Sequence, residues 1–335
     1  MKTFSFKFAL ATSFLCAAAF AGPTQAKQVW DMPNEYNDTS LPAEAQRAFG
    51  DVLMRETKGE IVIKNQFGGS MGYRSQDQFD MVGSGAVPIA NSNITTLGGI
   101  NSYFLLSSLP FLANSAQEAK TLWEISKPYY QKIFDQNNQV LLYATPWTPA
   151  GLWSKTPVKS LNDFKSLKIR TWDATGTQTL INAHANAVQL NWGDVVPQLA
   201  AGGIDAVLTS TEGGSNAKFW EHLKYFTSLN YSMSLNVTHM NKDVYNDLSD
   251  DQKKAIVDAS LKAEAVSWEG VVKRQEGNFV EMAKEGVHIQ KTAPADIMQA
   301  LTSAAKPIID SWMQKTGADG QSTLDAYYTA IGRKH

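Results

Sequence analysis

The chain has 335 residues, of which 43% are hydrophobic and 19% are charged, a composition typical of a folded protein with a sizeable core. Its length exceeds that of an average single domain and favours two domains. Basic and acidic residues number 30 and 32, so the formal net charge of -2 does not favour nucleic acid or an anionic membrane surface as a partner. The charge of a ligand must therefore be met by individually placed side chains.

Residues 1–26 have the pattern of a cleavable export segment. Two early lysines precede an apolar run over residues 8–20, and small residues follow as far as Ala26. The apolar run is shorter than the roughly 18 residues that a membrane-spanning helix needs. We therefore expect cleavage near Ala26 and a periplasmic mature protein that begins near Lys27.

The only cysteine, Cys16, lies inside this export segment. The mature protein is therefore expected to have no thiol and no disulfide. A lipid anchor on Cys16 is disfavoured because Leu15, rather than a small residue, precedes it. The sequence also lacks an H-E-x-x-H motif, a cysteine pair and a P-loop, so we expect no cofactor, although a metal that bridges a carboxylate ligand stays open.

From residue 29 onward, short apolar runs alternate with longer amphipathic segments, which predicts an α/β fold. The predicted strands cover residues 29–32, 60–67, 87–90, 140–145, 167–171 and 204–209. The predicted helices cover residues 41–58, 74–82, 116–136, 176–185 and 194–201. Because ligands in open α/β sheets bind outside the carboxyl ends of the strands, the residues that follow each strand are the candidates for a site.

The pattern changes after about residue 230. A further strand is predicted over residues 231–239, and a long helix is predicted over residues 249–286, with Ser249 as its N-cap and Gly286 as its stop. At 1.5 Å per residue this helix would be about 57 Å long, so it either lies across two domains or is broken once. No flexible linker is evident, so ordinary strands are expected to cross between the domains.

Several short segments carry a resemblance to a known family. Residues 160–170 read SLNDFKSLKIR, and the other segments, in chain order, are GGSMG at 68–72, LPFL at 109–112, KTP at 155–157 and PQLAAGGID at 197–205. Together they resemble the solute-binding proteins of tripartite ATP-independent periplasmic (TRAP) transporters, the DctP family. The resemblance covers most of residues 28–240, and the long late helix is similar to the domain-spanning helix of that family.

The resemblance implies a two-lobe periplasmic binding protein of type II-like fold, in which each lobe is a mixed β-sheet flanked by helices. It places lobe I at residues 27–148 plus about 236–280, and lobe II at 149–235 plus about 281–335. It further implies a receptor, not an enzyme, that binds a small organic acid anion and delivers it to the small and large TRAP membrane subunits for uptake driven by an ion gradient. We expect a monomer.

The resemblance also implies that Arg170, at the end of the KIR motif, holds the ligand carboxylate. An arginine is always charged, and its planar fork matches a carboxylate bidentately, so the residue type suits this role. Members of the family that bind sialic acid carry a second arginine where this chain has Ala150, which disfavours that ligand. Members of the family also carry an asparagine four residues after the aspartate that matches Asp205, and this chain has Thr209 there.

Other residues near strand ends complete the expected site. They are Glu35, Arg74, Asn91, Asn93, Trp147, Trp172, Thr209 and Glu212. Arg74 could instead pair with Asp77 on its own helix, and the two tryptophans could belong to the core. Aromatic rings with neutral amides and hydroxyls suit a sugar acid slightly better than a plain dicarboxylate, with an aromatic acid close behind.

Two other functions remain open. One is a receptor for another type of transporter. The other is a secreted α/β hydrolase, because residues 68–72 match the G-x-S-x-G motif with Ser70 as nucleophile. Histidines follow at 184, 222, 239 and 288, but none has a recognisable catalytic setting, and His288 lies in an apolar strand where a structural role is expected.

Overall fold

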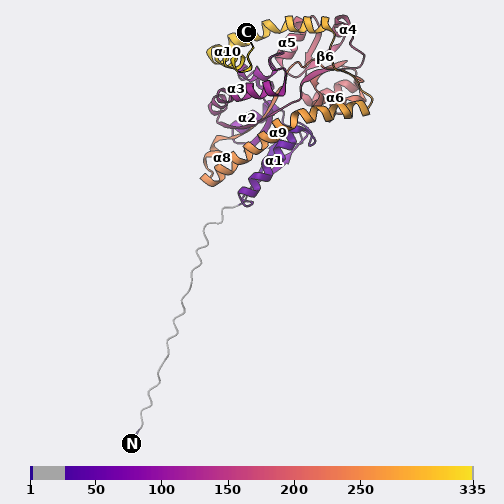
Figure 1. Ribbon diagram of the computed structural model, residues 1–335. Helices are drawn as coiled ribbons and strands as arrows, with labels where there is room; N and C mark the ends of the chain where they lie inside the picture. Colours follow the sequence, from indigo (N-terminus) through magenta and orange to yellow (C-terminus); the bar gives the residue numbers. More distant parts are fainter. Residues whose placement is uncertain (3–26, 334–335) are drawn as a thin grey trace.

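The computed structural model describes residues 1–2 and 27–333, so the predicted export segment with Cys16 lies outside the described residues. The protein is built of two α/β lobes, as the sequence predicts (Figure 1). The strands are β1 (Gln28–Pro33), β2 (Ile61–Gln66), β3 (Ile89–Asn93), β4 (Gln139–Pro146), β5 (Ala150–Ser154), β6 (Lys168–Thr171), β7 (Asn186–Gln189), β8 (Ala206–Ser210), β9 (Tyr225–Thr227), β10 (Leu235–Asn241) and β11 (His288–Gln290). The α-helices are α1 (Leu41–Glu56), α2 (Ser75–Gly83), α3 (Ala116–Gln136), α4 (Leu161–Ser166), α5 (Ala174–Asn182), α6 (Trp192–Ala200), α7 (Thr211–Asn216), α8 (Lys242–Asn246), α9 (Asp250–Lys284) and α10 (Ala295–Ile331).

The first lobe contains β1 to β4 and β10. Strands β1 and β2 form a parallel pair, and β10 lies between β3 and β4, antiparallel to both. A parallel bridge between Asn34 and Asn91 connects the two groups. Helices α1 and α3 cover this sheet and bury large side chains such as Phe49, Trp123 and Phe134.

The second lobe has a sheet of six strands in the order β11-β9-β5-β8-β6-β7. Strand β5 runs antiparallel to both of its neighbours, while β8, β6 and β7 are mutually parallel. The carboxyl ends of β6, β7 and β8 therefore meet at one edge of the sheet, which is where ligands bind in folds of this kind.

The chain passes between the lobes in extended segments. Strand β4 of the first lobe ends at Pro146 and β5 of the second lobe begins at Ala150, while residues 228–234 lead back from β9 to β10. This agrees with the prediction that strands, rather than a tether, cross between the domains. The residue limits predicted for the lobes, 27–148 with about 236–280 and 149–235 with about 281–335, stay a proposal.

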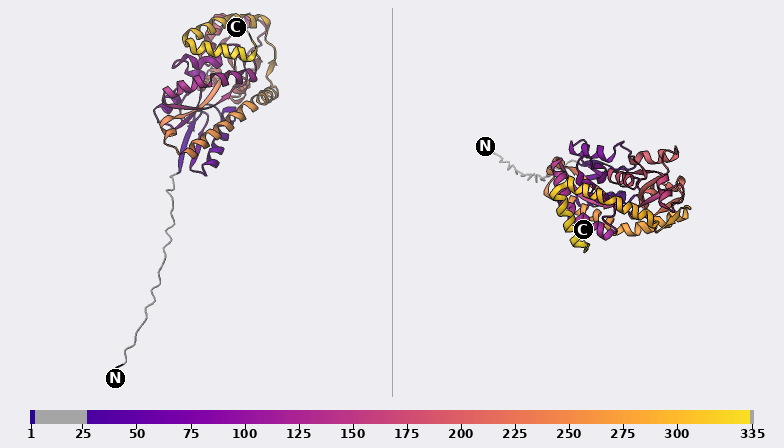
Figure 2. Two further views of the ribbon diagram at one scale, coloured as in Figure 1. Left: turned by 60° about the vertical axis from the view of Figure 1, so that its left-hand side comes forward. Right: turned by 90° about the horizontal axis from the view of Figure 1, so that it is seen from above.

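Helix α9 is continuous and lies across both lobes, as Figures 1 and 2 show. It begins after Ser249, whose side chain accepts a hydrogen bond from the Gln252 backbone in a capping box, and Gly286, with a positive φ of 79°, follows its end. Alanines such as Ala259 and Ala263 are fully buried and let α9 pack closely on α1 and β4. Its other end contacts α7 and β11 of the second lobe.

Helix α10 is the largest element that the sequence did not indicate. It packs on α4 and α5 and then on α3, so it too contacts both lobes. Pro307 lies inside it and Gly317 interrupts it with non-helical φ and ψ of 59° and −136°, which disguised its periodicity. Over the residues that the structure describes, none of the helices has both the length and the apolar character of a membrane span.

Candidate functional site

A cavity with about 380 Å³ of empty space, part of it open to solvent, lies between the two lobes. Residues at or just beyond strand ends of both sheets line it. From six different strands these include Tyr36, Asn93, Trp147, Arg170, Trp192 and Thr209. The arrangement follows from the topology, because parallel strands bring their carboxyl ends, and the side chains that follow them, to a common edge.

Four aromatic side chains line the cavity, namely Tyr36, Trp147, Trp172 and Trp192. The ring of Tyr36 lies 4.5 Å from that of Trp147 and 5.4 Å from that of Trp192, measured between ring centroids. The indole N–H groups of Trp147 and Trp172 donate to Asn236 (2.8 Å) and Thr95 (3.0 Å). These two rings are therefore oriented by the protein and offer apolar faces.

Arg170 provides the positive charge that lines the cavity, and its side chain is 2% exposed. Its Nε and Nη2 atoms donate to the backbone carbonyl of Leu190, at 3.0 and 2.8 Å, and its guanidinium lies 5.8 Å from the centroid of the Trp192 ring. Nη1 is buried and has no hydrogen-bond partner within the described chain. One edge of the guanidinium is thus fixed by the backbone, while Nη1 and the second N–H of Nη2 remain for an acceptor.

Burial dominates the electrostatics of this arginine. Removal from water lowers the pKa of Arg170 to about 10, against the opposing influence of Tyr36, Glu35 and other acidic groups. The guanidinium is still charged at neutral pH. A buried cation without a facing anion is costly, so the site is built to receive a carboxylate.

Several neutral polar groups of the lining are already engaged by the protein. The hydroxyl of Thr148 is 2.8 Å from that of Thr211, and Ser210 Oγ accepts from the Gly213 backbone at 2.9 Å. The amide of Asn93 donates to the hydroxyl of Tyr36 at 3.3 Å. These groups shape the wall more than they offer free hydrogen bonds to a ligand.

The structure brings five of the nine predicted site residues to the lining, namely Asn93, Trp147, Arg170, Trp172 and Thr209. Ala150, where an arginine would accompany sialic-acid binding, also lies there. Serines 232 and 234, on the segment that returns to the first lobe, complete the wall.

Three predicted residues lie beside the cavity rather than in its lining. The carboxylate of Glu35 accepts hydrogen bonds from the backbone and hydroxyl of Ser75, and burial raises its pKa. Asn91 donates to Thr238 inside the first sheet. Arg74 is half-exposed, and its guanidinium is 3.8 Å from Asp194 of α6 in the other lobe, so its side chain does not pair with Asp77 as one alternative had it.

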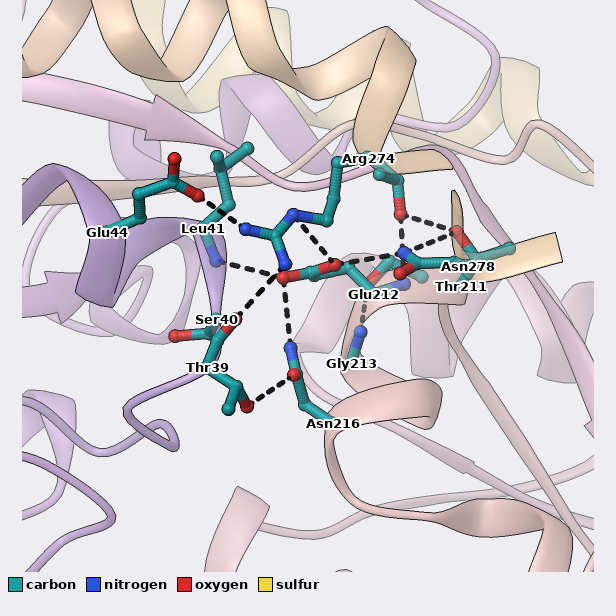
Figure 3. Close-up of polar contacts among 12 residues, drawn as sticks. Thr39, Ser40, Leu41, Glu44, Thr211, Glu212, Gly213, Asn216, Arg274 and Asn278 are labelled. Atoms are coloured by element: carbon teal, nitrogen blue, oxygen red, sulfur yellow. Dashed lines mark hydrogen bonds and ion pairs between the residues drawn. The ribbon is translucent and has the colours of Figure 1, made fainter. Parts of the chain in front are cut away.

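The fourth, Glu212, is buried in a separate cluster where the lobes meet (Figure 3). Its Oε1 accepts from the backbone N–H of Leu41 at 2.9 Å, at the start of α1. Its Oε2 accepts from Asn278 at 2.9 Å and lies 3.8 Å from Arg274 Nε, both on α9. Glu212 thus connects α7 of the second lobe to α1 and to the helix that spans both lobes.

The candidate serine nucleophile has a different setting from the one a hydrolase needs. The glycines at 68 and 69 adopt positive φ and donate backbone hydrogen bonds to Tyr36 and Asn34, so the loop pins the segment that carries Tyr36. The exposed hydroxyl of Ser70 donates to Gln66 at 3.3 Å. His239 is buried against Ser92 and Gln139, and burial lowers its pKa to about 3.

Among residues 1–2 and 27–333, no three side chains of the types His, Cys, Asp or Glu are grouped as metal ligands would be. The groups that line the cavity, one guanidinium with aromatic rings and hydroxyls, are donors and apolar faces rather than a set of anionic ligands.

Tyr36 follows the first predicted strand, so the rule of strand ends points to it as it does to Glu35, whereas Trp192, Ser232 and Ser234 were missed. Trp192 follows β7 at the same sheet edge as Arg170, but β7 is too short to be predicted from the sequence, so the rule of strand ends could not point to Trp192. The serines carry no sequence signal either. They line the cavity only because the connection back to the first lobe passes beside it.

Comparison with known proteins supports this picture. Residues 34–316 match the family model described as bacterial extracellular solute-binding protein, family 7 (DctP). The 2,3-diketo-L-gulonate-binding periplasmic protein YiaO of Escherichia coli strain K12 is 26% identical over 86% of this chain and 88% of its own. The solved structure of DctP7 from Bordetella pertussis, an extracytoplasmic solute receptor that binds pyroglutamic acid, has a TM-score of 0.86 at 28% identity and covers 90% of this chain and 99% of its own.

A TRAP solute-binding protein from a marine metagenome, specific for pyroglutamate, gives the same TM-score at 27% identity, with 91% of this chain and 99% of its own covered. The family model spans most of the chain, and the cavity between the lobes lies within the matched residues. The chain therefore belongs to the DctP family, the bacterial extracellular solute-binding proteins of family 7.

Proposed function

We propose that this member of the family is the extracytoplasmic receptor of a TRAP transporter and that its ligand is a small cyclic monocarboxylate of the pyroglutamate type. One observation carries the proposal: Arg170 Nη1 is buried and unpaired in a cavity whose walls are aromatic. A carboxylate would complete the hydrogen bonds of the guanidinium, and a flat ring would lie against the tryptophan faces.

The lining favours one carboxylate over two. Arg170 is the basic residue of the lining, and Ala150 occupies the position where a second arginine would serve another acid. A second carboxylate would have to lose its hydration without a cationic partner, which is costly. Dicarboxylates are therefore expected to bind weakly.

The lining also favours a compact ring over a polyhydroxylated chain, which reverses the slight preference for sugar acids drawn from the sequence. A sugar acid brings several hydroxyls that each need a partner once they leave water. Thr148, Ser210 and Asn93 already have partners within the protein. Relatives of known ligand show both kinds of acid, so the geometry of this cavity is the deciding support.

Delivery of the acid to TRAP membrane subunits, export with cleavage near Ala26 and a monomeric state complete the proposal. They rest on the family and on the composition of residues 1–26. As in the family, the role is binding and transfer rather than chemical conversion.

Isothermal titration calorimetry on residues 27–335 with pyroglutamate, galactonate and succinate tests the choice of ligand. We expect pyroglutamate to bind at least tenfold more tightly than the other two. Tighter binding of galactonate would restore the sugar-acid interpretation. Tighter binding of succinate would show that a second cation serves the site.

A further inference from the structure

Two buried atoms in the cavity lining have no hydrogen-bond partner among the described residues: Arg170 Nη1 and the hydroxyl of Ser232. The Ser232 side chain is 3% exposed. A hydroxyl removed from water without a partner costs free energy, and most buried polar groups have one. An unpaired hydroxyl in the wall of a binding cavity is therefore placed for a ligand.

The backbone around Ser232 fixes where this hydroxyl lies. The Ser232 carbonyl accepts from the Ala150 backbone at 2.9 Å, and the Ser234 carbonyl accepts from the Trp147 backbone at 2.9 Å. Ala150 and Trp147 belong to the opposite connection between the lobes. The two connections therefore hold each other in register beside the cavity.

The alternation of side chains along residues 231–234 also directs the Ser232 hydroxyl toward the cavity. Tyr231 packs in a core cluster of the second lobe and Met233 packs in a core cluster of the first, whereas Ser232 and Ser234 face the cavity. In extended backbone, residues i and i+2 share a face. A shift of one residue would bury two serines in the cores and expose Tyr231 and Met233, so the position of the Ser232 hydroxyl is strongly specified.

We propose that Ser232 determines specificity by hydrogen bonding to a neutral polar group of the ligand, away from the carboxylate held by Arg170. This inference rests on the proposed function. A serine hydroxyl donates and accepts, so it suits a ring carbonyl, an amide N–H or a hydroxyl equally. The ligand class is then a small acid with one carboxylate and one such neutral group on the same ring.

The test compares pyroglutamate with cyclopentanecarboxylate, which keeps the ring and the carboxylate but lacks the lactam. Calorimetry on the wild type and on Ser232→Ala should show pyroglutamate affinity falling about three- to tenfold, which corresponds to one neutral hydrogen bond. The affinity for cyclopentanecarboxylate should stay within twofold, because that acid has no group for Ser232 to bind.

Ser107→Ala is the matched control, because Ser107 also has a buried unpaired hydroxyl but lies outside the cavity lining. It should leave both affinities unchanged. Should Ser232→Ala lose its cooperative melting transition, Ser232→Cys retains a side chain of similar size with a weaker donor and should show the same selective loss.

An equal loss for both acids, or no loss for either, in a folded Ser232 variant would overturn this inference while leaving the proposed function intact. Failure of the wild type to bind either acid would contradict the proposed function, and the inference would fall with it.

Discussion

At the scale of single residues, the guanidinium of Arg170 is set by one backbone carbonyl. Leu190 accepts from Nε and Nη2, which aligns the opposite edge of the fork with the cavity. Because the protein has already fixed this side chain, binding of a carboxylate costs less side-chain conformational entropy than it would at a mobile arginine. The cost is a buried charge, which the ligand relieves.

Replacement of Arg170 is therefore expected to weaken ligand binding while leaving the fold intact. Arg170→Ala should weaken the binding of pyroglutamate by roughly 30-fold to several thousand-fold, the cost of truncating one member of a buried ion pair. Arg170→Lys should recover only part of this loss, because an ammonium cannot reproduce the fork. Calorimetry measures the affinities, and melting curves without ligand check the fold.

Arg74→Ala is the control for Arg170. Arg74 is also basic and near the cavity, but its half-exposed side chain pairs with Asp194, so its removal should change affinity by less than threefold. If Arg170→Ala binds within threefold of the wild type while Arg74→Ala does not, the carboxylate is held by Arg74 instead.

Some site residues can be predicted from the sequence, while others cannot be told apart from their immediate neighbours in the chain. Arg170 ends a recognisable strand motif, so both the motif and the rule of strand ends point to it. Glu35 and Tyr36 are neighbours in one loop, yet the tyrosine lines the cavity and the glutamate turns to Ser75. Such a choice depends on the loop conformation, which the glycines at 68 and 69 help to fix from a distance in sequence.

At the scale of elements, Glu212 joins three helices that the chain keeps far apart in sequence. Its carboxylate meets the N–H of Leu41 at the positive end of α1, as well as Arg274 and Asn278 of α9. A buried carboxylate is stabilised by a helix N-terminus and by charge-assisted hydrogen bonds. We name this cluster of Glu212, Leu41, Arg274 and Asn278 the interlobe latch.

The interlobe latch should contribute to affinity without touching the ligand. Its contacts to α1 exist only while the lobes are together, so they favour the closed state, and a ligand that needs this state gains from them. Glu212→Ala is expected to weaken pyroglutamate binding about tenfold, mainly through faster dissociation. Surface plasmon resonance measures both rates.

Asp258→Ala provides the comparison, since it removes an exposed ion pair with Lys254 on the surface of α9 and should leave both rates unchanged. If Glu212→Ala releases pyroglutamate at the wild-type rate, the interlobe latch contributes nothing to the free energy that favours the closed state.

Elements with strong periodicity were predictable, and those defined by tertiary pairing were not. The bounds of α3 match the prediction at both ends, and α9 was found together with its caps. Strands β7, β9 and β11 have three or four residues each, too few to show a period, and they exist because a neighbouring strand pairs with them. Strand β5 contains Gly151, because any larger side chain there would collide with Phe226. Glycine is unfavourable in strands, so this requirement of the packing weakens the sequence signal for β5.

At the scale of the whole molecule, the connections between the lobes determine which motions are available. Two extended crossings lie side by side at the base of the cavity, and the continuous α9 passes along both lobes. Side-chain contacts that join the lobes directly include Trp172 to Thr95 and Arg74 to Asp194, besides the interlobe latch. The lobes are therefore expected to rotate about the crossings, with these side-chain contacts breaking as the cavity opens.

Ligand should shift this rotation toward the closed arrangement, and a pair of spin labels can report it. The predicted mature chain has no cysteine, so Asp80→Cys on α2 and Gln198→Cys on α6 would label one exposed position in each lobe. Saturating pyroglutamate should shorten and narrow the distribution of distances between the two labels, because an acid that binds both lobes stabilises only the closed state. Double electron–electron resonance measures this distribution. As a control, labels at Lys64→Cys and Asp80→Cys lie within the first lobe, and the distance between them should stay the same when ligand binds. If the labels on the two lobes keep one distance with and without bound ligand, the site is rigid and closure plays no part in capture.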